Sequence, residues 1–505
     1  MADAIQALAL VNRMYARIDA RRPVFRKRED YYQGKHPLNF ATEEWRKSNA
    51  ARYAGFADNW CRPVVDAEAE RVQVQGIKLG DADKGGKGAA LLHEQWLLNE
   101  MEAQSSQGFL TSLTTSTSFV LVWGDSDDES VITWEHPSSF EIEYDWANRR
   151  KRVAALKTWA DDSHEFATLY TATEVWKFQR LRSSTPDERT SQADQAREEH
   201  STTGGWLPRE VAEETWPIPN PMGEVPAVEI PNRPILAGDP VSEIEGVMAM
   251  QDAINLLWAY MFLAADYASM PARVITGAEP PKIPILDKDG KVVGHRDVEV
   301  KDIGEKRFMF INGQNVGIDH WPAATLDPFI KVIRFAVGHV AMQTRTPATY
   351  MAIDTGLSNV AEGGLKASEV PLNTKVREFQ TFANPGLREM YRLVALAKGD
   401  QSLAELARRA QIGWVNPEIR SESQMADALL KKKQTGYPFE YLLEMDGMDQ
   451  PTIGRVIRMR EQEMTDPMIA GALREFAEVP DGGSADGAGS VPESAAGSGG
   501  DGGGF

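Results

Sequence analysis

The chain has 505 residues, of which 42% are hydrophobic and 26% charged, as is typical of a globular protein with two to four domains. Its formal net charge of −19 at pH 7 argues against an ordinary nucleic-acid-binding protein, because such proteins gain much of their affinity by neutralising phosphates. The single cysteine, Cys61, excludes an intramolecular disulfide, and we expect it to be a small buried apolar residue.

Neither the N-terminus nor the most apolar run predicts a membrane protein. Residues 1–30 carry charges throughout and lack the apolar core and cleavage site of a signal peptide. The most apolar run, residues 253–265, is shorter than the roughly 18 residues that suggest a membrane span. We therefore expect a buried helix there and no membrane partner.

The first hundred residues predict mainly helices, and a β-rich block follows. Residues 58–79 open with the helix-start signal Asp58-Asn59 and end in a short strand, and residues 81–90 predict a loop. Apolar runs around polar turns then predict three hairpins, at residues 118–136, 138–161 and 166–180.

Two polar segments interrupt the β-rich block. The first is an acidic turn that lacks the ligand spacing and central glycine of a helix–loop–helix calcium site, so we expect a solvated turn with Asp125, Asp127, Asp128 and Glu129. The second, residues 183–205, is polar and charged and predicts a mobile insertion.

Two helices separated by a small β module come next. Asp239-Pro240 starts the first helix, residues 241–269, and Pro271 stops it. A strand-and-turn module occupies residues 272–325, and the second helix covers residues 327–344. With the preceding hairpins, this pattern predicts an α+β fold.

The second helix has two faces. Phe329, Ile333, Ala336 and Val340 form an apolar stripe. Another side carries Lys331, Arg334, Gly338 and Arg345, which is either a solvated basic face or a strip that faces a polyanion.

The segment GLSNVAEGGLKASEVPLNTKVREFQ, residues 356–380, resembles a phosphate-binding loop but lacks its Gly-Lys-Ser/Thr triplet, because Leu365 separates Gly364 from Lys366. It predicts a helix that starts near Asn359 with a capping signal and reaches about residue 398. Pro371 should bend this helix, and glycines weaken its first turn. We interpret the segment as a hinge formed by Gly363, Gly364 and Pro371.

Three short helices, residues 422–435, 439–445 and 452–464, end the folded part, and an acidic tail without basic residues, expected to be disordered, begins at residue 478. No histidine spacing fits a common metal motif, and no nucleophile elbow or dinucleotide-binding fingerprint occurs. We expect no catalytic residue, no metal and no cofactor, and hence no enzyme.

The order of these parts resembles the portal proteins of tailed bacteriophages, of the head-to-tail connector type found in long-tailed actinobacteriophages. The resemblance covers about residues 25–470. It rests on the phrases YYQGKHPL, NWCRPVVDAEAERVQVQGI, FVLVWGD, FEIEYD, TLYTATEVWKF and NVAEGGLKASEVPLNTKVREFQ in this order.

The resemblance implies a portal-type subunit with an α/β wing, two stem helices around a β-rich clip, a kinked long helix and a helical crown. The implied parts are wing 1–238, stem helix 239–270, clip 271–325, stem helix 326–344, tunnel loop 345–358, kinked helix 359–420 returning to the wing, crown 421–476 and disordered acidic tail 477–505.

The resemblance also implies a ring, usually of twelve subunits, at one vertex of the capsid. Double-stranded DNA would pass through it non-specifically during packaging and ejection, driven by a separate terminase, and the ring would then anchor the tail connector. The other implied partners are the major capsid protein and the scaffold. The protein would belong to the virion and assemble in the host cytoplasm.

Carried onto this sequence, the resemblance suggests two sets of site residues. DNA-channel candidates are Lys331, Arg334, Arg345, Tyr350, Met351 and Asp354. The implied clip carries the basic residues Lys282, Lys288, Lys291 and Arg296. These residues either contact terminase or the connector, or lie on a solvated turn. The net acidic chain suits a conduit, because tight phosphate binding would hinder sliding.

Two alternatives stay open. One is another head–tail adaptor or capsid-associated protein without a channel, although such adaptors are usually much shorter and lack the helix–β module–helix arrangement. The other is a DNA-processing enzyme, a nuclease or a transferase, with scattered acidic residues.

Overall fold

The computed structural model describes residues 2–36, 43, 47, 56–80, 82–83, 86–124, 130–182, 205–212, 214–269, 273–276, 282–297, 308–311, 317–320, 325–351, 362–418, 422–448 and 450–465. The chain divides into two compact units, Met1–Pro451 and Thr452–Phe505. In the second unit the structure describes most of one helix, α13 (Gln450–Thr465), close to the predicted bounds.

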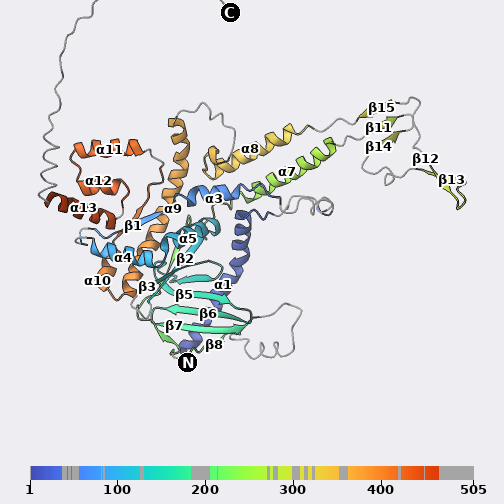
Figure 1. The fold of residues 1–505 in the computed structure, drawn as a ribbon. Coiled ribbons are helices and arrows are strands. Elements are labelled where there is room, and N and C mark those ends of the chain that lie inside the picture. Colours follow the sequence, from blue (N-terminus) through green and yellow to red (C-terminus); the bar gives the residue numbers. More distant parts are fainter. Residues whose placement is uncertain are drawn as a thin grey trace, which may run out of the picture. The chain divides into compact units, whose positions relative to one another are not determined.

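The first unit contains a six-stranded antiparallel sheet covered on one face by the long helix α1 (Ala2–Tyr32) (Figure 1). The sheet has the order β4 (Phe140–Tyr144), β5 (Arg152–Ala160), β6 (His164–Thr171), β7 (Glu174–Leu181) and β8 (Leu207–Pro208), and β9 (Ile218–Pro219) also pairs with β7.

Apolar residues one helical turn apart dock α1 on this sheet. Val11, Met14 and Ile18 are fully buried against Leu156 and Leu169. A row of ion pairs continues the contact at β4: Arg13 and Arg17 reach Glu143, and Arg17 and Arg21 reach Glu141.

A second sheet covers part of the opposite face. It has the order β10 (Ala227–Pro231), β2 (Thr117–Gly124), β3 (Ser130–Glu135), all antiparallel. Phe119 and Ala227 from this sheet pack with Phe140 and Ile142 of the first. The three predicted hairpins are therefore confirmed as β2–β3, β4–β5 and β6–β7.

Helices surround the main core of the unit. They are α3 (Cys61–Ala69), α4 (Lys87–Leu98), α5 (Met101–Thr115), α9 (Glu362–Ala397) and α10 (Gln401–Ala407). The predicted start of α3 is confirmed, since Asn59 Oδ1 accepts from the backbone N–H groups of Cys61 and Arg62. Cys61 is buried as expected, and burial, the largest cause, raises the pKa of its thiol to about 12.

Two strands far apart in the sequence pair at the edge of this core. The predicted strand β1 (Val74–Lys78) is antiparallel to β16 (Gln411–Trp414), with Val74 opposite Trp414. The sequence analysis did not identify α10, β16 or β10, because their short apolar runs lie between stronger signals.

The predicted strand-and-turn module between α7 (Met248–Ser269) and α8 (Asp327–Gln343) is confirmed, with five strands among its described residues. They are β11 (Arg273–Thr276), β12 (Lys282–Leu286), β13 (Val292–Asp297), β14 (Phe308–Ile311) and β15 (Gly317–His320), with β11 parallel to β14. Among the described residues, no helix is both long and apolar enough to cross a bilayer.

The predicted start of α7 near residue 241 is wrong by about two turns. Ser242 Oγ donates to the carbonyl of Thr114, and Asn232 Nδ2 donates to the carbonyl of Val241 and to Glu243 Oε1. These bonds attach residues 241–243 to the end of α5 and to the chain after β10, so the helix starts only at Met248.

The predicted helices at the end of the first unit are confirmed as α11 (Glu422–Gln434) and α12 (Phe439–Met445). Gly436 and Gly447 follow them with φ of +91° each, which favours glycine as a helix terminator. The acidic turn at 125–129, residues 183–204 of the insertion predicted at 183–205, the cap at Asn359 and the acidic tail predicted from residue 478 lie outside the described residues.

Candidate nucleic-acid interface

Helix α8 buries one face and exposes the other. Ile333, Ala336, Val337, Val340 and Ala341 are buried, while Phe329 is half-buried. This confirms the predicted apolar stripe. Pro328 in the first turn suits the start of α8, because proline has no N–H to leave unpaired there.

Two of the three predicted cations lie on the exposed part of α8. Lys331 and Arg334 are both exposed, and at about 100° per residue they share a side of the helix with Gly338. This pair is the only part of the predicted basic strip that α8 itself carries.

Arg345 does not continue the basic side of α8, so that part of the prediction is wrong. The helix ends at Gln343, and Arg345 adopts a left-handed backbone with φ of +56°. Its guanidinium pairs with Glu378 of α9 at 3.1 Å. The charge of Arg345 is therefore partly neutralised within the chain.

The segment after α8 begins with a short 3₁₀ helix, η2 (Ala348–Met351). Met351 is only 1% exposed and belongs to the main core, so its position does not fit the predicted contact with DNA. Tyr350 is more exposed, and its hydroxyl accepts a hydrogen bond from Arg71 Nη2 at 2.7 Å. Asp354 lies outside the described residues.

The predicted hinge residues lie at the start of α9. Gly363 and Gly364 are in its first turn, and Pro371 is inside the helix. Residues 366–368 are exposed, whereas Leu372 and Val376 are fully buried. Pro371 thus marks the point at which α9 passes from solvent into the core, and α9 also contains Pro385, which the sequence analysis did not single out.

Directly after Pro371, α9 carries a buried ion cluster, which we call the Lys375 cluster. Lys375 Nζ lies 2.9 Å from Glu68 of α3 and 2.7 Å from Glu243, and all three side chains are at most 1% exposed. Arg233 Nε approaches Glu243 at 3.3 Å. The cluster connects α3, the segment before α7, and α9.

The Lys375 cluster holds two carboxylates for one buried ammonium group. Desolvation by burial raises the pKa of Glu68 to about 7, with Lys375 lowering it and Glu243 raising it further. The carboxylates in turn raise the pKa of Lys375 despite its burial. The cluster is a structural junction, since it has no access to solvent.

The basic residues of the predicted clip lie on and beside a hairpin. Lys282 begins β12, and Lys288 and Lys291 flank the turn to β13; all three are exposed. Asp287 Oδ1 accepts from the backbone N–H groups of Asp289 and Lys291, which fixes the turn. Arg296 lies in β13, opposite Ile283.

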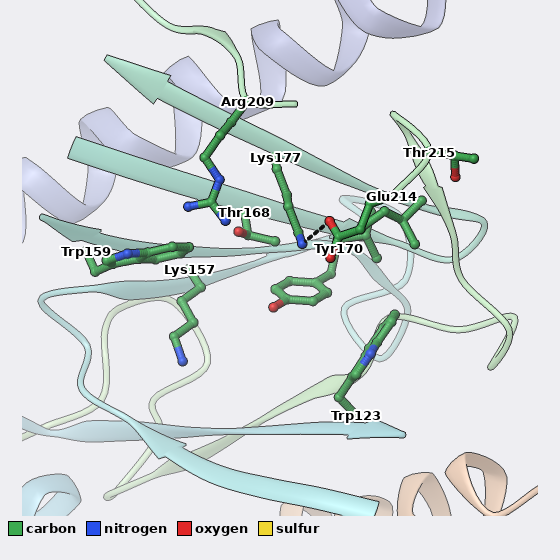
Figure 2. Close-up of a pocket in the computed structure, with 11 residues that line it drawn as sticks. Trp123, Lys157, Trp159, Thr168, Tyr170, Lys177, Arg209, Glu214 and Thr215 are labelled. Atoms are coloured by element: carbon green, nitrogen blue, oxygen red, sulfur yellow. Dashed lines mark hydrogen bonds and ion pairs between the residues drawn. The ribbon is translucent and has the colours of Figure 1, made fainter. Parts of the chain in front are cut away.

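A hollow of about 860 Å³ opens on the six-stranded sheet, on the face opposite α1 (Figure 2). Trp159 of β5 and Tyr170 of β6 line it, and Trp123 of β2 lies across from the strands. Two of its cations are paired within the chain, Lys177 with Glu214 and Lys157 with Glu135. The hollow therefore presents aromatic surface more than free positive charge.

Two features of the site region escaped the sequence analysis. The Lys375 cluster joins residues that are distant in the sequence, so no local sequence pattern predicts it. The second feature is an exposed apolar stripe on α8, formed by Val332, Phe335 and Met342 together with His339. Its spacing of i, i+3, i+7 and i+10 is visible in the sequence and could have been found.

Among the described residues, no group of three potential ligands could hold a metal ion.

Comparison with known proteins gives consistent matches. The family described as "Phage portal protein, SPP1 Gp6-like" matches residues 12–445. The portal protein of Mycobacterium phage L5 is 24% identical over 385 residues, which cover 73% of this chain and 71% of that protein. The portal protein of Mycobacterium phage D29 is 24% identical over 384 residues with the same coverage.

Proposed function

Because the chain belongs to the phage portal protein family, we propose that twelve copies of it close into a ring around an aqueous channel at one vertex of the capsid. Members of this family are structural proteins of the virion that serve as the conduit for DNA packaging, and this chain is not an enzyme. The finer assignments below extend that role to particular residues.

The observation that carries the channel assignment is the charge of α8 within a strongly acidic chain. The formal net charge is −19, and the exposed side of α8 carries Lys331 and Arg334. A duplex passing an acidic wall is repelled, whereas two cations per subunit give a few weak, salt-sensitive contacts. Such a lining guides DNA without holding it.

A double charge reversal tests this assignment. Lys331→Glu with Arg334→Glu should leave rings intact and lower the amount of DNA retained per head. Arg408→Glu with Arg409→Glu, two exposed charges at the end of α10, is the matched control and should leave retention unchanged. Loss of ring formation in the double variant would instead assign these residues to the subunit interface.

We also place the contact with terminase or connector at the β12–β13 hairpin. Lys288 and Lys291 lie at the turn fixed by Asp287, and Lys282 lies at the other end of β12, opposite Asp297. All three lysines are exposed and give this hairpin cationic side chains along its length. Reversing the charges of Lys282, Lys288 and Lys291 should weaken co-purification of terminase with assembled rings and leave ring formation intact. Unchanged co-purification would indicate an ordinary solvated turn.

Electron microscopy of purified particles distinguishes the proposed ring from its alternatives. End-on views should show a ring with a central hole, and mass photometry should give the mass of twelve chains when scaffold is supplied. Persistent monomers under those conditions would contradict the ring. Hydrolysis of DNA by the purified chain, lost on replacing one carboxylate, would favour the enzyme alternative.

A further inference from the structure

Helix α8 carries a projecting apolar side chain on one side and borders an apolar hollow on the other. Phe335 is 72% exposed and Met342 is 80% exposed, so the described part of the subunit covers neither side chain. Val332 and His339 extend the same stripe, and the His339 ring lies 4.7 Å from that of Phe335. Large exposed apolar patches of this kind mark interaction surfaces.

The hollow, which we call the α7–α8 hollow, has a volume of about 310 Å³. Trp258 and Met261 of α7 and Ile330, Ile333, Arg334 and Val337 of α8 line it. Its rim is fixed by hydrogen bonds, because Asp58 Oδ2 accepts from the indole N–H groups of Trp60 at 2.8 Å and Trp258 at 2.7 Å. A preformed apolar hollow binds an apolar side chain at low cost in ordering.

The two features face away from each other. At about 100° per residue, Phe335 lies roughly 140° from Ile330 and about 160° from Ile333 and Val337 around the axis of α8. A subunit therefore cannot insert its own Phe335 into its own hollow. Complementary surfaces on opposite sides of one element form a head-to-tail contact, which closes into a ring when the rotation permits.

Charge does not oppose the same pairing. Lys331 lies one turn before Phe335, and the residues that line the hollow include both the carboxylate of Asp58 and the guanidinium of Arg334. An inserted Phe335 therefore meets a lining whose formal charges balance, and apolar surface carries the contact.

We infer that Phe335 of one copy inserts into the α7–α8 hollow of a second copy of this chain, and that this contact repeats around the ring. The inference rests on the proposed ring. It also leaves room for a channel contact: Lys331 lies in the arc between the hollow and Phe335, on the side not covered by the core, whereas Arg334 is among the residues that line the hollow. When both flanks touch neighbours, Lys331 is left facing the channel.

Thiol cross-linking tests the pairing. The double variant His339→Cys/Ile330→Cys, which keeps Phe335, is assembled with scaffold and treated with a short bis-maleimide. Both positions are exposed, so the subunit should fold, and the buried Cys61 thiol should not react. We expect a ladder of linked oligomers from the double variant and no ladder from either single variant.

Each other outcome overturns the inference in a recognisable way. A dimer from His339→Cys alone would show a symmetric contact. Rings without a ladder would remove the inference and leave the proposed function intact, whereas wild-type chains that never form rings would remove both. The yield of rings from Phe335→Glu is a second measurement and should fall at least about tenfold. Trp146→Glu, which changes a side chain 91% exposed in the sheet region, is the control and should not lower the yield. Equal yields of rings from the two variants would contradict the contact.

Discussion

Replacing Lys375 with methionine should lower the free energy of unfolding of the first unit by about 3–5 kcal/mol at pH 7.5. Methionine retains an unbranched apolar stem, so the change removes charge without a large cavity. The carboxylates of Glu68 and Glu243 then stay buried, with the cation of Arg233 at 3.3 Å from Glu243 and the amide of Asn232 donating to Glu243 Oε1. An exposed ion pair removed in the same way would cost about 1 kcal/mol or less.

The pH dependence of this cost distinguishes buried charge from lost packing. Without the ammonium group, the folded variant should hold the proton of Glu68 more tightly than the wild type does. Burial raises the pKa of Glu68 to about 7 in the wild type, so the wild type takes up the same proton itself below pH 7. The cost should therefore shrink by about 1 kcal/mol between pH 7.5 and pH 5.5, mostly above pH 6.5.

Urea unfolding of the dilute full-length chain, followed by the fluorescence of its 13 tryptophans, measures these effects. Lys366→Met, on the exposed start of α9, is the matched control and should change stability by no more than about 0.5 kcal/mol. Adding Glu68→Gln to Lys375→Met should recover part of the loss. A cost below about 1 kcal/mol, or one that does not change with pH, would refute the reasoning.

Three further predictions concern stability and motion. Burial raises the pKa of Glu68 to about 7, so between pH 5 and 7 the folded state holds a proton that the unfolded chain has lost. Wild-type stability should therefore fall as pH rises from 5 to 7.5. Glu68→Gln should flatten this slope in urea titrations. Gly386→Ala should lower the melting temperature, because its Cβ would lie 2.4 Å from a backbone carbonyl oxygen of β10. Gly338→Ala, with open space on α8, should instead raise stability by about 0.5–1 kcal/mol. An unchanged melting temperature for Gly386→Ala would contradict the close approach. If Pro371 is a hinge, Pro371→Ala should slow amide exchange before residue 371 and impair DNA packaging. Pro385→Ala, inside the same helix, should leave packaging normal. Equal effects of the two variants would argue against a special role of Pro371.

Local patterns predicted the elements whose signals are self-contained. The hairpins follow from alternation around polar turns, and α11 and α12 follow from the glycines that end them. The buried stripe of α8 follows from its period, since Ile333 and Val340 face the core. These features depend on neighbours a few residues away.

Features that depend on distant residues were missed or misplaced. The start of α7 is set by hydrogen bonds from Ser242 and Asn232 to other segments, which override the Asp-Pro start signal. Arg345 was assigned to the basic side of α8 because the left-handed turn after Gln343 has no glycine to announce it. Met351 was assigned to the channel because its burial depends on packing against the main core.

The β1–β16 pair has a consequence for synthesis of the subunit. Because Val74 can pair only after Trp414 has left the ribosome, the main core cannot be completed by a shortened chain. Premature termination anywhere before β16 leaves β1 with an open edge, and quality control can recognise such an edge. Only finished subunits would then be available when a capsid begins to grow.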